Sequence, residues 1–87
     1  MDRYSLEFKR SVARDLRGVP ARDVARILRC FEALADNPRA PGCEKLSQQE
    51  RYRLRQGVYR ISYEIHDELL LVVVVKVGHR RDVYQGG

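Results

Sequence analysis

The sequence predicts an α+β fold, within the wider α/β class, in which a small twisted, antiparallel-rich sheet carries an N-terminal helical hairpin on one face. Three observations predict it: apolar residues at helical spacing in the first half, alternation with a period of two in the second half, and a short length. A chain of 87 residues has room for one hydrophobic core, so we expect a single domain over residues 1–87. The expected element order is βααβββ.

The first half reads as one strand and two helices. Residues 4–8 alternate large apolar and polar side chains, which predicts a short strand, and residues 12–16 then follow helical spacing up to Gly18. The second helix gives the clearest pattern, because its apolar residues recur at i, i+3, i+4 and i+7 until Asn37-Pro38 ends it. Its expected core residues are Val24, Ile27, Leu28, Phe31, Leu34 and Ala35.

The second half reads as three strands. Residues 52–55 and 59–65 alternate apolar and polar side chains on either side of a turn expected at Gln56-Gly57. Residues 69–77 are nearly all apolar and β-branched, which is typical of a central strand covered on both faces. Three tyrosines share the apolar parity and are expected in the core, namely Tyr52, Tyr59 and Tyr63.

The charge of the chain favours a polyanionic partner. Lysine and arginine total 17 against 12 acidic residues, giving a net charge of +5, and all but three of the basic residues are arginines. A guanidinium group presents a planar fork of donors that fits phosphate in a bidentate way. We therefore expect contact with nucleic acid, with a merely solvated basic surface as the alternative.

The cysteines and the apolar segments bound the cellular setting. Cys30 and Cys43 form no C-x-x-C pair and no metal-ligand pattern with His66 or His79, so we expect reduced cysteines, no metal and no cofactor. The apolar run at 69–75 is too short to span a bilayer, and the N-terminus lacks the apolar segment of a signal peptide. A cytoplasmic protein without a membrane partner is expected.

Arginines are expected to meet across the first hairpin of the second half. If residues 56 and 57 form a two-residue turn, Arg53 lies directly opposite Arg60 on the face away from the helices, and Arg55 shares their parity. No acidic residue lies on the flanking positions of that face, and Glu64 is four residues further along. Like charges placed opposite each other destabilise a sheet by a few tenths to about 1 kcal/mol. We interpret this face as a phosphate cradle, with two solvated arginines as the alternative.

The segment after the last strand combines charge with an aromatic ring. Arg80, Arg81 and Tyr84 follow the strand closely, and a tyrosine can stack on a base while guanidinium groups hold the flanking phosphates. A ring packed against the sheet edge is the alternative for Tyr84. His79 is able to exchange a proton near neutral pH, with a solvated turn residue as its alternative.

Six segments, taken in order, resemble the RelE/ParE toxin superfamily across nearly the whole chain. They are Tyr4-x-Leu6-x-Phe8, Asn37-Pro38-Arg39, Lys45-Leu46, Tyr52-Arg53-Leu54-Arg55, Gly57-x-Tyr59-Arg60-Ile61-x-Tyr63-Glu64 and Val77-Gly78-His79-Arg80-Arg81-Asp82-Val83-Tyr84. No single segment is diagnostic, whereas the ordered set is specific. The final segment is more similar to the RNA-cleaving RelE branch than to the gyrase-poisoning ParE branch.

The resemblance implies the toxin of a type II toxin–antitoxin system. Such a toxin is an endoribonuclease that enters the ribosomal A site and cuts mRNA without metal, by attack of a 2′-hydroxyl on the adjacent phosphate. It also implies a cognate antitoxin that holds the toxin inactive. Carried over by position, the catalytic residues are Arg53, Arg55, Arg60, Arg80 and Tyr84. Lys45 and Arg81 are expected to contact RNA.

One departure from the family affects proton transfer. The best-known members have lysines where this chain has Arg53 and Arg55, and one of those lysines is assigned as the general base. An arginine, with a pKa above about 12, does not readily give up a proton at neutral pH. The base is therefore expected to be His79, Glu64 or a water molecule. The alternative functions are a ParE-like non-enzymatic inhibitor of DNA gyrase and an inactive module that only binds an antitoxin.

Overall fold

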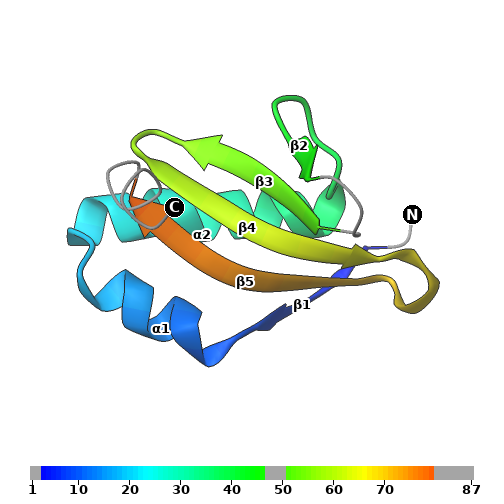
Figure 1. Cartoon of the computed structure of the whole chain (residues 1–87), viewed down its shortest axis with the longest axis horizontal. Coiled ribbons are helices and arrows are strands. Elements are labelled where there is room, and N and C mark those ends of the chain that lie inside the picture. Colours follow the sequence, from blue (N-terminus) through cyan, green and yellow to red (C-terminus); the bar gives the residue numbers. More distant parts are fainter. Residues whose placement is uncertain (1–2, 47–50, 80–87) are drawn as a thin grey trace.

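The computed structural model describes residues 3–46 and 51–79. It confirms the predicted α+β class and adds a short strand, β2, that the sequence patterns do not reveal (Figure 1). The elements in chain order are β1 (Ser5–Phe8), α1 (Arg10–Arg17), α2 (Ala21–Asp36), β2 (Glu44–Leu46), β3 (Arg51–Gln56), β4 (Tyr59–His66), the 3₁₀ helix η1 (Asp67–Leu69) and β5 (Leu71–His79).

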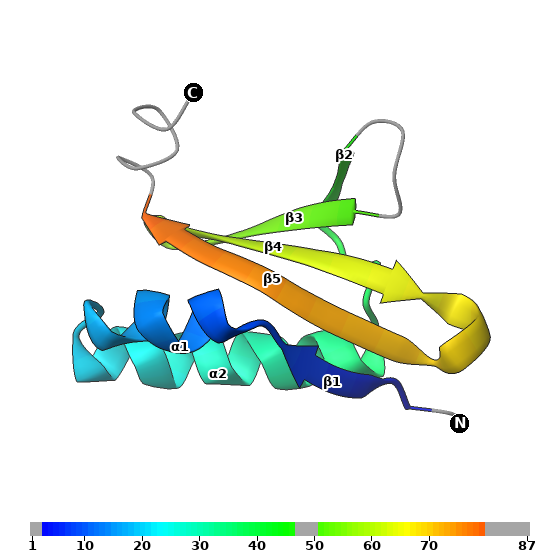
Figure 2. The ribbon, with the colours of Figure 1, turned by 60° about the horizontal axis from the view of Figure 1, so that its bottom comes forward.

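The strands form one mixed sheet in the order β1-β5-β4-β3-β2. Strand β1 pairs with β5 in parallel, and the other neighbours are antiparallel. The apolar strand β5 therefore lies inside the sheet, between β1 and β4, although it begins at Leu71 because the two preceding residues belong to η1 and to a left-handed Leu70. The expectation that this strand is covered on both faces is wrong. Both helices lie on one side of the sheet, and in the described part of the chain no helix covers the other side, which we call the open face (Figure 2).

The core lies between α2 and the sheet. Strand β4 alternates strictly, with buried residues at every second position, and the predicted core tyrosines Tyr52, Tyr59 and Tyr63 are all buried. Helix α2 contributes Ile27, Phe31, Leu34 and Ala35. The prediction for Leu28 is wrong, since its side chain is 47% exposed. A helix that touches the sheet along one side buries only a narrow stripe, and Leu28 lies about 100° around from Ile27.

Helix α1 completes the edge of β5. Strand β1 pairs with β5 only from Leu71 to Val74, and beyond that point the chain has turned into α1. Side chains of α1 replace the missing strand: the Ser11 hydroxyl donates to the Val75 carbonyl at 2.8 Å, and an Asp15 carboxylate oxygen accepts the Val77 N–H at 3.0 Å. These two bonds satisfy backbone groups that a short edge strand would leave unpaired.

A polar clasp ties three distant segments together. Arg39, in the loop after α2, donates two hydrogen bonds of 2.9 and 2.8 Å to the two carboxylate oxygens of Asp67 in η1. The Tyr4 hydroxyl donates to the same carboxylate at 2.7 Å, and Arg39 also donates to the Tyr52 hydroxyl at 3.3 Å. The hydrogen bonds from Arg39 and Tyr4 lower the pKa of the Asp67 carboxyl to about 2. The clasp therefore holds the start of β1 beside the connection between β4 and β5.

We predict that Tyr63→Phe destabilises the fold. The Tyr63 side chain is fully buried, and its hydroxyl donates to the Pro38 carbonyl at 2.7 Å. Removing the Tyr63 hydroxyl leaves the buried Pro38 carbonyl without its hydrogen bond, so we expect the free energy of unfolding to fall by about 1–3 kcal/mol. Urea denaturation measures the loss. Tyr59→Phe is the control, since its hydroxyl makes only a long 3.4 Å bond to Asp23, and equal losses in both variants would contradict the assignment.

The clasp predicts a defined acid dependence of stability. Because folding depresses the pKa of Asp67, its contribution is complete above the unfolded-state value of about 3.9 and is lost as the pH falls through about 2. Asp67→Asn should lower Tm at neutral pH and flatten the fall of Tm between these two limits. Thermal melts over a pH series measure both effects. Glu68→Gln removes an exposed carboxylate from the same turn and should leave the profile unchanged. A wild-type profile from Asp67→Asn would refute the role of the clasp.

Candidate functional site

The β3–β4 hairpin sets the register of the arginines. Its loop is Gly57-Val58, and the pairs are Gln56 with Tyr59 and Arg55 with Arg60. The prediction that Arg53 lies opposite Arg60 is therefore wrong by two residues. The reason is that the turn consists of Gly57 and Val58 and not of Gln56 and Gly57. Gly57 has a φ of +60°, and a type II′ turn requires such a residue at the first of its two central positions. A shift of two residues keeps the parity, so the arginines stay on the open face.

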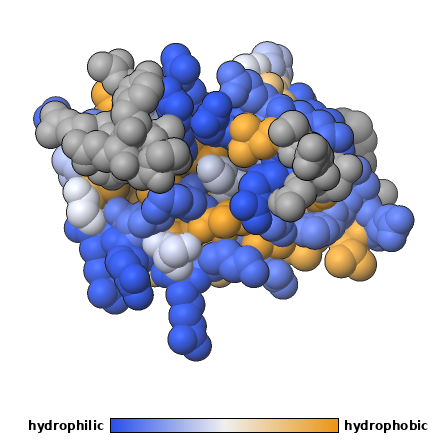
Figure 3. Space-filling view, in the orientation of Figure 1, coloured by the Kyte–Doolittle hydropathy of each residue, from blue (hydrophilic) through white to orange (hydrophobic). Residues whose placement is uncertain are grey.

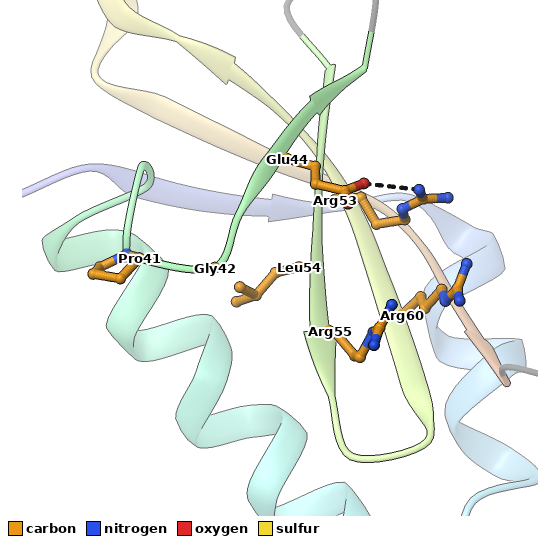
Figure 4. A pocket seen from close by; sticks show the side chains of 7 residues that line it. All are labelled: Pro41, Gly42, Glu44, Arg53, Leu54, Arg55 and Arg60. Atoms are coloured by element: carbon orange, nitrogen blue, oxygen red, sulfur yellow. Dashed lines mark hydrogen bonds and ion pairs between the residues drawn. The ribbon is translucent and has the colours of Figure 1, made fainter.

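Three arginines share a shallow pocket on that open face. Arg53 and Arg55 come from β3 and Arg60 from β4, and Figure 4 shows their side chains on the same side of the hairpin. The face of the molecule seen in Figure 3 is mostly hydrophilic, with smaller hydrophobic patches. The pocket has a volume of about 320 Å³ and is lined by Pro41, Gly42, Glu44, Arg53, Leu54, Arg55 and Arg60. The arrangement can hold an anion with several charged donors at once.

Strand β2 brings a carboxylate into the arginine pocket. A Glu44 carboxylate oxygen lies 2.9 Å from a terminal nitrogen of Arg53, in an ion pair that leaves 62% of the Glu44 side chain exposed. The Arg53 guanidinium lowers the pKa of the Glu44 carboxyl, and the charges of Arg55 and Arg60 lower it further. The expectation that no acidic residue flanks the arginines is therefore wrong. A strand of three residues shows no alternation, so the sequence gives no signal that would place Glu44 here.

Glu64, an expected proton carrier, is engaged elsewhere on the open face. It lies opposite Arg51 in the register, accepts a hydrogen bond from that side chain at 3.1 Å, and lies 3.1 Å from the His66 ring nitrogen. His66 and Arg51 lower the pKa of its carboxyl. Glu64 does not line the arginine pocket.

Two other expected residues lie away from the pocket. His79 is paired with Tyr59 and packs edge-on against that ring, with the centroids 5.5 Å apart. Since Tyr59 has the parity of the core face, His79 lies on the side of the sheet opposite the arginines. Lys45 is the residue next to Glu44 on β2, so its side chain leaves the opposite face of that strand. The structure therefore brings together Arg53, Arg55 and Arg60, but not His79 or Lys45.

The remaining expected residues lie outside the described part of the chain. Arg80 follows the last described residue, and Arg81 and Tyr84 come shortly after it. Their roles stay predictions from the sequence.

The described segments show neither a metal cluster nor a membrane-length helix. Across residues 3–46 and 51–79, no three His, Cys, Asp or Glu side chains gather as they would around a metal ion. Neither helix in these segments has the length and apolar content to cross a membrane.

Sequence comparisons identify a toxin family. A family model described as the ParE toxin of the type II toxin–antitoxin system parDE matches residues 6–84. The toxin RelG of Mycobacterium tuberculosis is 34% identical over 86 residues, which cover 94% of this chain and 97% of RelG. A putative RelE-like toxin protein of Escherichia coli is 27% identical over 86 residues, covering 94% of this chain and 90% of that protein.

Solved structures agree with the sequence comparisons. The toxin–antitoxin complex RelBE2 from Mycobacterium tuberculosis contains a chain that matches with a TM-score of 0.80 and 31% identity, covering 92% of this chain and 94% of that one. The archaeal RelE–RelB complex from Pyrococcus horikoshii OT3 matches the fold with a TM-score of 0.80 at 24% identity, covering 92% and 97%. The family match over most of the chain, with these relatives, places the protein in the RelE/ParE superfamily of toxins from type II toxin–antitoxin systems.

Proposed function

We propose that this toxin is an endoribonuclease that cuts mRNA in the ribosomal A site, without a metal ion. In the proposed reaction, the 2′-hydroxyl of the substrate attacks the adjacent phosphorus and the bond to the 5′-oxygen of the next nucleotide breaks. The products are a 2′,3′-cyclic phosphate and a 5′-hydroxyl. Because ribosomes are the site of action, the proposal places the toxin in the cytoplasm.

The observation that carries this proposal is the convergence of Arg53, Arg55 and Arg60 on one open pocket. Arg55 and Arg60 lie directly opposite each other in the ladder, a pairing that their like charges destabilise. An arriving phosphate relieves this repulsion. The pentavalent phosphorane carries one more negative charge than the starting diester, so the same guanidinium groups stabilise the transition state more strongly than the substrate.

Glu44 supplies the proton acceptor that the arginines cannot provide. Its lowered pKa keeps the carboxylate ionised at neutral pH, and it is the acidic residue among those lining the pocket. We assign it the role of taking the proton from the attacking 2′-hydroxyl, while Arg53 holds the carboxylate in position at 2.9 Å. The proton required by the leaving 5′-oxygen is assigned to Arg80 or a water molecule, and Tyr84 is assigned to orienting the base. These two roles rest on the sequence alone.

A cognate antitoxin is the second proposed partner. Its support is that chains with this fold occur in the toxin–antitoxin complex RelBE2 and in the archaeal RelE–RelB complex described above. An antitoxin of acidic character would complement the net charge of +5 on this chain.

We predict that Arg55→Gln and Arg60→Gln each reduce mRNA cleavage by about 10²–10³-fold, the usual loss when one transition-state donor is removed. Each change should also relieve the growth arrest caused by the toxin. Primer extension on mRNA from arrested cells measures the cuts. Arg3→Gln is the matched control, because it removes one positive charge from an exposed ion pair with Asp36 on α2 and should leave cleavage intact.

The same experiment separates the rival functions. Cuts phased with the codons support ribosome-dependent cleavage, whereas double-strand DNA breaks without mRNA cuts would favour a ParE-like gyrase inhibitor. Full cleavage by a folded double variant at Arg55 and Arg60 would exclude the proposed site. A chain that arrests no growth without its antitoxin would be an inactive binding module.

We predict that neutralising Glu44 slows the cleavage step without weakening substrate binding. In Glu44→Gln, the single-turnover cleavage rate should fall by about 10²-fold or more, since the proton acceptor is lost. Binding of the mRNA-loaded ribosome should be unchanged or tighter, because one negative charge leaves the arginine pocket. Glu44→Asp should restore part of the rate. A folded Glu44→Gln variant that cuts at the wild-type rate would show that Glu44 only pairs with Arg53.

A further inference from the structure

The outer surface of the helices carries a second set of arginines. Each helix has three of them at spacing i, i+4 and i+7, and all are exposed. We call them the two arginine rows: Arg10, Arg14 and Arg17 on α1, and Arg22, Arg26 and Arg29 on α2.

The rows face away from the arginine pocket. On α1 the inward positions are Val12 and Leu16, which pack on the core, and the row occupies the positions about 140–200° around the helix from Val12. On α2 the row occupies one flank and the outer side, away from Ile27 and Leu34. Both helices cover the face of the sheet opposite the open one (Figure 2). Each row is therefore a basic surface separate from the arginine pocket, and Arg26 also lines a small pocket with residues 56–59 of the β3–β4 turn.

The acidic residues of the two helices are engaged with other groups. Asp15 accepts the Val77 N–H and lies 3.7 Å from the Lys76 ammonium group. Asp23 accepts a long hydrogen bond from the Tyr59 hydroxyl. The two acidic residues near the end of α2 both pair with Arg3, namely Glu32 and Asp36. Within residues 3–46 and 51–79, no arginine of the rows has an acidic partner at ion-pair distance.

The placement of the rows favours the helices that bear them only in part. Arg14 and Arg17 lie in the last turn of α1, where the helix dipole favours a cation. Arg10 is the first residue of α1 and Arg22 the second of α2, where the dipole disfavours a cation. Within each row, like charges three and four residues apart also repel each other, and a bound polyanion relieves that repulsion.

We propose that the two arginine rows bind the phosphate backbone of double-helical RNA. Binders of single strands stack bases on aromatic rings, and neither helix exposes one, since the only aromatic residue on them, Phe31, is buried. The half-exposed Phe8, just before α1, already has its ring against that of Phe31, with the centroids 5.2 Å apart. A helical RNA is recognised mainly through its backbone and shape, which guanidinium groups suit. A protein partner would need a larger apolar patch, and Leu28 is the only large hydrophobic side chain that the described helices expose.

This inference goes beyond the proposed function. It rests on that function only in naming RNA, among polyanions, as the ligand. A nuclease working on ribosome-bound mRNA is surrounded by folded RNA. A second basic face would hold the toxin against that RNA while the open face reaches the scissile phosphate.

The test compares two triple variants with the same change in net charge. Arg10→Gln/Arg14→Gln/Arg17→Gln removes the row on α1, and Arg53→Gln/Arg55→Gln/Arg60→Gln removes the pocket. Both are titrated with a blunt RNA duplex of about 16 base pairs, a length that presents two successive minor grooves. Binding is measured over a series of salt concentrations, and circular dichroism and thermal melts check the folding of both variants.

The row variant should bind the duplex at least about tenfold more weakly near physiological salt, with a salt slope reduced by about two to three. The pocket variant should lose clearly less affinity for the duplex than the row variant. Equal losses in both variants would mean that only net charge matters, and either this result or the absence of wild-type binding overturns the proposal. So does a row variant that keeps duplex binding but loses its antitoxin. If the rows bind the duplex but the toxin cleaves no mRNA, the nuclease proposal is wrong and the proposal of duplex binding still holds.

Discussion

The alternation of strand β4 is the constraint on which the rest of this structure depends. Its eight residues are buried and half-buried in strict turn, so a single strand supplies core side chains to one face and polar side chains to the other. Tyr63 and Ile61 are fully buried under the helices, while Arg60 projects from the opposite face. A slip of one residue would exchange the two sets, which would bury a guanidinium and expose a tyrosine. The core and the candidate site are therefore fixed by the same register.

The arginine pocket exists because its charges are partly balanced at its margins. Arg55 and Arg60 oppose each other directly, and the neighbouring arginines of β3 form ion pairs, Arg53 with Glu44 and Arg51 with Glu64. These ion pairs are only partly buried, so each contributes little to stability on its own. Their effect is to hold the guanidinium groups of Arg51 and Arg53 in place beside the Arg55–Arg60 pair.

The periodic parts of the molecule could be predicted from the sequence, and the irregular parts could not. Hydrophobic spacing correctly predicted α2 and the alternation of β4, and a continuous apolar run correctly predicted that β5 lies inside the sheet, because each pattern extends over eight residues or more. The pairing of Arg53 with Arg60 was wrong because it depended on which residues form the turn, and either side of Gly57 looks plausible in sequence.

The candidate site shows the same division. The parity of the arginines follows from alternation, so their gathering on the open face could be anticipated. Glu44 could not, because β2 is only three residues long and is recruited to the sheet by its contact with β3. His79 was expected near the arginines for its chemistry, yet its register opposite Tyr59 puts it on the other face. A residue chosen only because its side chain can carry out the chemistry is misplaced when the face of the sheet on which it lies is unknown.

The thinness of the fold explains how so small a protein can carry charge on both of its faces. Its core is a single layer between one sheet and one pair of helices, so most elements, β5 apart, have one apolar side and one side in water (Figure 2). A charged side chain on either outer surface keeps its hydration, and no deep cavity is needed to place several arginines together. A polyanion extends along a surface and does not need to be enclosed. A two-layer domain with arginine-rich outer surfaces is therefore suited to a nucleic acid and poorly suited to a small molecule that must be buried.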